Sequence, residues 1–183
     1  MAAEQIETTI LLRLVDRQQI SLSDPVSKWF PNYPHANEAT LRMLAASSSG
    51  FGDYVLGRPI RRWGYQPFGD LFYQHPYRRF TARQLIRRSQ APYQEPQYTN
   101  SGGDWQYSHT NFVMLGAILE KITGRKYGTL VRKLITKPLG LDNTVFPSTS
   151  KIQRPVLHAF TSERGAYEDS TYWRPSWTFS QAI

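Results

Sequence analysis

The chain has 183 residues, with 22 basic against 14 acidic residues and a formal net charge of +8 at pH 7. It contains no cysteine, which excludes disulfides, zinc–thiolate sites and a cysteine nucleophile and leaves the redox compartment open. Hydrophobic residues make up 40% and aromatic residues 14% of the chain, which favours one globular domain over residues 1–183 rather than disorder.

Helical spacing is clearest at the start of the chain. A helix predicted over residues 2–19 places its apolar side chains on one face, at Ile6, Ile10, Leu11, Leu14 and Val15. Pro25 breaks the pattern, and a helical turn is expected over residues 26–30. Thr40 is expected to cap a helix over residues 40–46 that a run of serines and Gly50 ends. Residues 51–80 show no clean period and predict a long irregular excursion with one short helix.

The second half of the chain carries the strongest helix signal. Thr81 is expected to cap a helix that runs to Arg88, and residues 91–108 are again irregular. A helix is predicted over residues 111–123, with Ser108 or Thr110 as its cap and Gly124 as its left-handed stop. Another short helix is expected over residues 127–136. The chain then turns strand-like or loop-like at 144–147, and residues 156–183 show no helical period.

Arginines account for much of the positive charge, at Arg61, Arg62, Arg78, Arg79, Arg83, Arg87 and Arg88. We favour a solvated surface, because such attraction is long-ranged and unspecific. The alternative is a basic module that binds anions through Arg61, Arg62, Arg87 and Arg88; a nucleic-acid partner is not expected, since no recognition motif accompanies these residues.

Three strings, in this order along the chain, carry a resemblance to a known family. The first is LVDRQQISLSDPV at residues 14–26, in which Gln18 stands where relatives have glycine. The second is LRMLAASSSGF at residues 41–51, in which Ser47 replaces a histidine. The third is WQYSHTNFVMLG at residues 105–116, which is followed by EKITG and PLGL. Together they resemble the serine β-lactamase and penicillin-binding-protein-like hydrolases, in particular the branch of class C β-lactamases, D-alanyl-D-alanine carboxypeptidases and esterases.

The resemblance implies an α/β fold of the β-lactamase/transpeptidase type. Because the strings cover the helical part, the chain is expected to be the mainly helical subdomain, with much of the antiparallel sheet missing. We therefore expect residues 1–183 to form one partial domain. A helical subdomain without its sheet is expected to expose the apolar faces of the helices at 2–19 and 111–123, and so to self-associate unless a partner covers them.

The resemblance also assigns site residues, and it predicts that acyl transfer fails. Family members keep a serine one helical turn before a lysine, because positions i and i+3 share a helix face and the amine can take the hydroxyl proton. By register from Leu14, the serine position falls on Met1 and the lysine position on Glu4. Tyr107 stands at the position of the family's general acid/base, and His109 at that of a substrate-binding asparagine. The third family element, Lys-Thr-Gly or His-x-Gly on a strand, does not occur in this sequence.

Two functional hypotheses follow. The chain is a fragment or truncated form of an acyl-serine hydrolase acting on a β-lactam, a D-alanyl peptide or a small ester, or it is a non-catalytic ligand-binding protein on the same scaffold. The partner of a complete relative would be a small-molecule or peptide substrate. Such relatives are often periplasmic, secreted or attached to the cell envelope, whereas no signal peptide is recognisable in this sequence, and the compartment stays open.

Other candidate sites are weak. The sequence from Ser148 to Lys151 has the Ser-x-x-Lys spacing, but it follows Pro147 in an irregular stretch. His35, His75 and His158 have no acidic partner at ligand spacing in the sequence, so we expect neither a metal site nor a cofactor.

Overall fold

The computed structural model describes residues 2–57, 67–90, 102–103, 105–147, 149 and 155–173. Its helices and strands, in chain order, are α1 (Ala2–Asp16), η1 (Val26–Lys28), α2 (Leu41–Ala45), α3 (Phe68–Gln74), α4 (Ala82–Arg88), α5 (His109–Thr123), α6 (Tyr127–Val131), η3 (Arg132–Thr136), β1 (Phe160–Thr161) and β2 (Glu168–Asp169). The described part of the chain is thus mainly helical with one two-stranded antiparallel sheet, as predicted.

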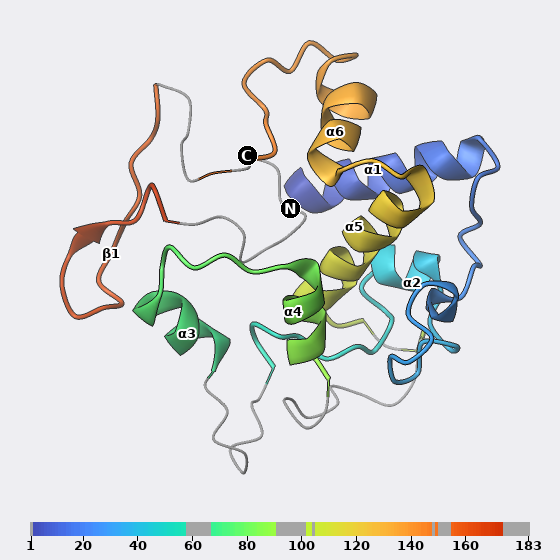
Figure 1. Cartoon of the computed structure of the whole chain (residues 1–183), viewed down its shortest axis with the longest axis horizontal. Helices are drawn as coiled ribbons and strands as arrows, with labels where there is room; N and C mark the ends of the chain where they lie inside the picture. The colour runs from blue at the N-terminus through green and yellow to red at the C-terminus, as the bar shows by residue number, and fades with distance from the viewer. Residues whose placement is uncertain are drawn as a thin grey trace.

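Helix α5 is the centre of the molecule, and α1, α2, α4 and α6 all pack against it (Figure 1). Its side chains are buried on nearly every face, among them Val113, Met114, Leu115, Ile118 and Leu119. Each such side chain stabilises the fold by about 1.5–3 kcal/mol relative to an exposed one. The expectation that α5 would expose an apolar face is therefore wrong, because neighbouring helices of the same chain cover it.

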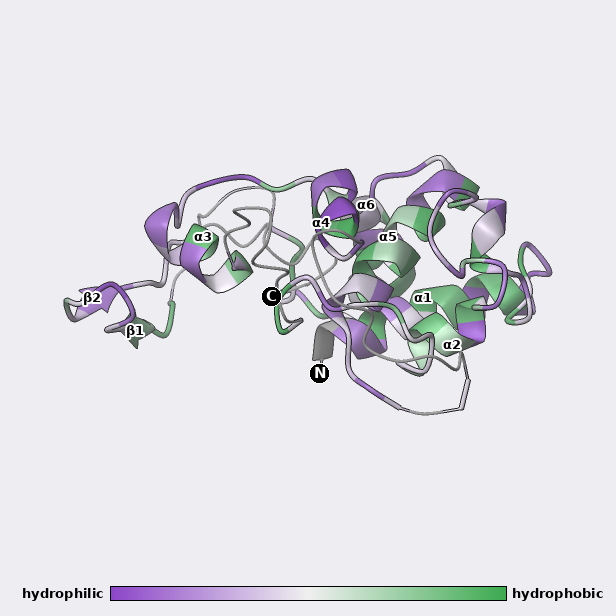
Figure 2. Cartoon of the chain, turned by 90° about the horizontal axis from the view of Figure 1, so that it is seen from below, coloured by the Kyte–Doolittle hydropathy of each residue, from purple (hydrophilic) through white to green (hydrophobic). Residues whose placement is uncertain are grey.

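The inner face of α1 is also covered, since Ile10, Leu11 and Leu14 are at most 2% exposed. Leu12 is 44% exposed and lies on the outer side. Figure 2 shows the apolar residues gathered on α1, α2 and α5. The core of the chain is thus built from helices that the 3.6-residue period predicts.

The predicted helix caps are largely confirmed. The Thr40 hydroxyl accepts the Met43 N–H, and Thr81 forms a reciprocal capping box with Gln84. Gly124 ends α5 with a φ of 63°. At the end of α1, Gln18 takes a φ of 56° at the position where the family pattern has glycine. A non-glycine residue there carries a steric cost that glycine would not.

Several boundaries differ from the predictions. Helix α1 ends at Asp16 rather than residue 19, and α5 begins at His109 rather than residue 111. The Ser108 hydroxyl does not cap α5, because it donates to the Gly52 carbonyl instead. Residues 144–147 form no strand. The predicted helix over residues 127–136 is confirmed, but its second half, η3, is wound as a π-helix.

Helix α3 and the β1–β2 hairpin lie to one side of the helical cluster (Figures 1 and 2). Trp173, which follows the hairpin, packs edge-on against Phe72 of α3 with ring centroids 5.5 Å apart. The hairpin pairs Phe160 with Asp169 and Thr161 with Glu168. In the described ranges, no helix has the length and apolar character needed to span a membrane.

Candidate active site

The second family-like string contacts the third, and a residue shortly before it, through backbone hydrogen bonds. The Ser48 carbonyl accepts the Gly102 N–H at 2.7 Å, and the Ser47 carbonyl accepts the Gln106 N–H at 3.1 Å. These bonds hold the segment before α5 against the loop after α2. Tyr107 is positioned by this pairing at the start of α5.

Tyr107 faces α1. Its Oη donates a hydrogen bond of 2.9 Å to Glu4 Oε1, and both side chains are partly buried. The structure thus brings together residue 107 and residue 4, which the family register makes the general acid/base and lysine positions. Met1, at the serine position of that register, lies outside the described residues.

The electrostatics of this pair keep the proton on the phenol. Burial, and then the hydrogen bond and negative charge of Glu4, raise the pKa of Tyr107 well above its ordinary value. Burial raises the pKa of Glu4, but the hydrogen bond from the amino terminus, a backbone hydrogen bond, the bond from Tyr107 and the positive charge of the amino terminus outweigh it and lower this pKa overall. Tyr107 is therefore a neutral donor near pH 7, and Glu4 is an ionised acceptor.

His109 is held by a carboxylate that the sequence reading missed. His109 Nδ1 lies 2.9 Å from Oδ2 of Asp53, which is fully buried. Because a carboxylate oxygen accepts, the tautomer with the proton on Nδ1 satisfies this contact. The ring also packs edge-on against Tyr107, with centroids 4.9 Å apart. The His109 side chain is 14% exposed, so the ring retains access to solvent.

Asp53 also organises the backbone around it. Its carboxylate accepts the N–H of His109, the first residue of α5, at 3.3 Å and the N–H of Val55 at 2.7 Å. A carboxylate at a helix N-terminus compensates the free N–H groups and the helix dipole. A sequence signal existed, since Asp53 is the lone charge in the apolar stretch Gly50–Leu56. A lone carboxylate among apolar residues is a candidate for a buried, partnered group.

Glu7 is a second group that the sequence reading missed. It lies one turn after Glu4 on α1 and is fully buried. Burial, followed by the negative charges of Glu7 and Glu4, raises the pKa of the Tyr127 phenol on α6. The face of α1 toward the site is therefore acidic, where the family keeps a cation.

The remaining sequence candidates lie elsewhere. Ser148 and Lys151 are outside the described residues. His35 bonds Glu38, and His158 bonds Asp169 at 2.8 Å, both at exposed positions. Among the residues the structure describes, no group of three His, Asp or Glu side chains could hold a metal ion.

Comparison with known proteins identifies the family. The family model described as Beta-lactamase matches residues 6–181. The chain belongs to this β-lactamase family. A D-stereospecific amidohydrolase from a Streptomyces species superimposes with a TM-score of 0.82 and 34% identity, over 96% of this chain and 52% of its own. Esterase EstB of Burkholderia gladioli is 31% identical over 75% of this chain and 35% of its own length. A penicillin-binding protein of Bacillus subtilis is 27% identical over 73% of this chain and 27% of its own.

The chain of this β-lactamase family member spans only part of these proteins. It covers 27% and 35% of the two curated relatives and 52% of the amidohydrolase structure. The chain therefore shares the family fold over the part of these proteins that it matches.

Proposed function

We propose that this chain forms the helical side of a serine-hydrolase site for a small acyl compound, such as a β-lactam, a D-alanyl peptide or a small ester, and that it does not carry out acyl transfer by itself. The observation that carries the proposal is the 2.9 Å hydrogen bond from Tyr107 Oη to Glu4 Oε1. A carboxylate occupies the place where the family register expects an amine.

The Glu4 carboxylate and the amine that the family register expects carry opposite charges. Acyl transfer to a serine needs a neighbouring group that takes the hydroxyl proton. A cation beside Tyr107 would favour the tyrosinate that can accept this proton, whereas burial and the Glu4 carboxylate raise the pKa of the phenol. Tyr107 then donates a hydrogen bond to Glu4 and does not take up the proton of a serine hydroxyl. Met1, three residues before Glu4 in the sequence, has no hydroxyl to activate.

In this proposal Tyr107 keeps the family's general acid/base position and His109 the position that contacts substrate. The pairing with Asp53 orients the His109 imidazole, which lies edge-on against Tyr107. A partner segment would have to supply a reactive hydroxyl, its amine and a strand that binds the substrate carboxylate.

A second candidate function is reversible ligand binding without catalysis. It is favoured by the Asp53–His109 pair, because a buried carboxylate orients the imidazole whether or not a nucleophile is present.

Self-association would use apolar residues outside α5. Trp105, two residues before Tyr107 and 71% exposed, is the candidate beside the site.

Covalent labelling tests the proposal. The 183-residue chain is incubated with a fluorescent penicillin and, separately, with a fluorescent fluorophosphonate, and labelled protein is followed on denaturing gels and by intact-protein mass spectrometry. We expect no covalent adduct. An adduct of stoichiometric yield on any residue would overturn the proposal.

Reversible binding is measured in parallel by the ¹H–¹⁵N NMR shifts of backbone amides around Tyr107 and the start of α5 during titration with benzylpenicillin and D-alanyl-D-alanine. The matched variants are His109→Ala and His158→Ala, because His158 is also paired with an aspartate but lies at an exposed position on the hairpin side. Saturable shifts lost only in His109→Ala favour ligand binding. Shifts that are equal in both variants would contradict a binding role for His109.

A further inference from the structure

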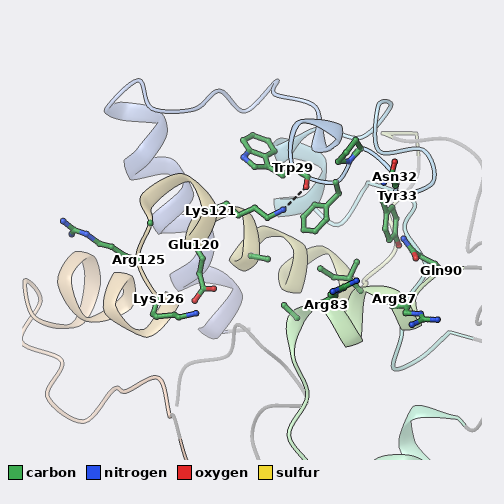
Figure 3. A pocket seen from close by; sticks show the side chains of 16 residues that line it. Trp29, Asn32, Tyr33, Arg83, Arg87, Gln90, Glu120, Lys121, Arg125 and Lys126 are labelled. Carbon is green, nitrogen blue, oxygen red and sulfur yellow. Dashed lines mark hydrogen bonds between the residues drawn. The ribbon is translucent and has the colours of Figure 1, made fainter.

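A concave site lies at the opposite end of α5 from Tyr107. It has a volume of about 970 Å³ and is walled by residues 29–33, helix α4, the last turns of α5 and residues 124–126. Figure 3 shows Arg83 and Arg87 projecting from α4, and Lys121 reaching from α5 toward Trp29. A volume of this size lies within the range of about 300–1,000 Å³ that ligand sites occupy. We call it the basic groove.

The groove is strongly cationic. Its lining includes Arg83, Arg87, Lys121, Arg125 and Lys126. Glu120 is the only carboxylate among the lining residues that the structure describes, and its Oε1 already accepts the Tyr127 N–H at 2.8 Å. The charge of this surface therefore favours an anionic occupant.

One wall of the groove is aromatic and held in place. The Lys121 ammonium lies 4.4 Å from the centroid of the Phe30 ring and donates a 2.8 Å hydrogen bond to the Trp29 carbonyl. Tyr33 Oη and Ser89 Oγ are hydrogen-bonded at 2.9 Å, which ties the same segment to the end of α4. An occupant would meet a prearranged apolar surface, which reduces the ordering cost of binding.

We propose that the basic groove binds an acidic peptide segment carrying an apolar side chain. The guanidinium groups of Arg83 and Arg87 lie one turn apart on α4, and such groups hold carboxylates through paired hydrogen bonds. The apolar side chain would lie against Phe30 and Ile86, which line the same groove. This inference is independent of the proposed hydrolase site.

Other occupants fit the charges less well. A second copy of this chain carries the same net charge of +8, so its approach is opposed by repulsion. A polyphosphate backbone would place a continuous row of charges along a groove that also contains Glu120 and the C-terminal, negative end of the α5 dipole. A peptide can space its carboxylates to avoid that end.

Fluorescence anisotropy of the full 183-residue chain tests this assignment. The probe is a fluorescein-labelled eight-residue peptide of alternating glutamate and phenylalanine, and the comparison probe replaces glutamate with lysine. We expect saturable binding of the acidic probe alone, weakened as salt is raised from about 0.05 to 0.5 M. The double variant Arg83→Glu/Arg87→Glu should weaken binding by about tenfold or more.

The matched control is Arg132→Glu/Lys133→Glu, which changes the charge equally at exposed positions of η3 outside the groove. The single variant Arg83→Glu provides a milder test should the double variant unfold, as judged by circular dichroism. Three outcomes would overturn the proposal: no binding of the acidic probe, equal weakening in the control variant, or tighter binding of a fluorescein-labelled oligonucleotide that displaces the peptide.

Discussion

The two ends of helix α5 are built in different ways. At the N-terminal end, buried groups from the loop after α2 hold the helix, since Asp53 accepts the His109 N–H and the Gly52 carbonyl accepts the Thr110 hydroxyl at 2.6 Å. At the C-terminal end, the stop is local, with Gly124 donating to the Glu120 carbonyl and Lys121 exposed on the groove. A single helix thus joins an end anchored by buried residues from a distant loop to an end whose backbone stop is local and whose contact with Trp29 lies at the surface. We expect substitutions at the N-terminal end of α5 to lower the free energy of unfolding more than substitutions at its C-terminal end.

The largest effect is expected at Asp53. Asp53→Ala removes the acceptor of the His109 N–H, the His109 Nδ1–H and the Val55 N–H in a fully buried place. Because hydrogen bonds to a charged group contribute about 1.5–3 kcal/mol, we expect the free energy of unfolding in urea to fall by about 2–3 kcal/mol. The exposed Asp142→Ala serves as control and should change it by less than about 0.5 kcal/mol. Similar losses in both variants would contradict the comparison between the two ends.

The alkaline stability of the chain tests the Tyr107–Glu4 pair. The pKa of Tyr107 is raised by folding, so this phenol contributes stability that is fully present below its unfolded pKa of about 10 and is lost as pH rises above that value. Tyr33, Tyr54 and Tyr127 are shifted in the same direction by burial. We therefore expect the urea midpoint to fall above about pH 10, and to fall less steeply in Tyr107→Phe.

Glu4→Gln provides the companion measurement. It removes the negative charge beside the phenol, so the pKa of Tyr107 should fall toward its ordinary value in an NMR or absorbance titration. The pKa should remain raised, because burial is its largest cause. An unchanged pKa in Glu4→Gln would show that the two side chains do not interact as described.

The smallest effect is expected at the C-terminal end. Lys121→Ala removes the contact with the Phe30 ring and the bond to the Trp29 carbonyl, both at the surface. We expect a loss of about 0.5–1 kcal/mol in the free energy of unfolding, against almost none for the exposed Lys133→Ala. A loss at Lys121 as large as that at Asp53 would show that the two ends are equally demanding.

Much of the fold was predictable because its signals are local. The apolar spacing of α1 and α5, the caps at Thr40 and Thr81, and the stop at Gly124 each depend on a few neighbouring residues. The start of α5 was placed two residues late for the opposite reason. Its cap is Asp53, which is 56 residues away from His109 in the sequence. A carboxylate that reaches a helix from a distant loop leaves no mark in the helix's own sequence.

The candidate site was predictable only in part. Tyr107, His109 and Glu4 could be named by register with the family strings, and the structure places Glu4 against Tyr107 and Tyr107 against His109. The burial of Glu7 and the pairing of Asp53 with His109 could not be read from spacing, because both depend on how α1 and the loop after α2 pack. The sequence named Arg83 and Arg87 as basic residues and left an anion-binding module open, but not the groove itself, since Lys121, Arg125 and Lys126 join them only in the folded chain.

The contact between Asp53 and His109 also bears on the order of folding. Bringing together Asp53 and His109, which are 56 residues apart, costs chain entropy that is lost before their hydrogen bonds form. The Gly124 stop, by contrast, forms between residues four apart. Nucleation of α5 is thus expected to start from its carboxyl half. The His109 imidazole is expected to contact the Asp53 carboxylate only after the intervening chain has folded.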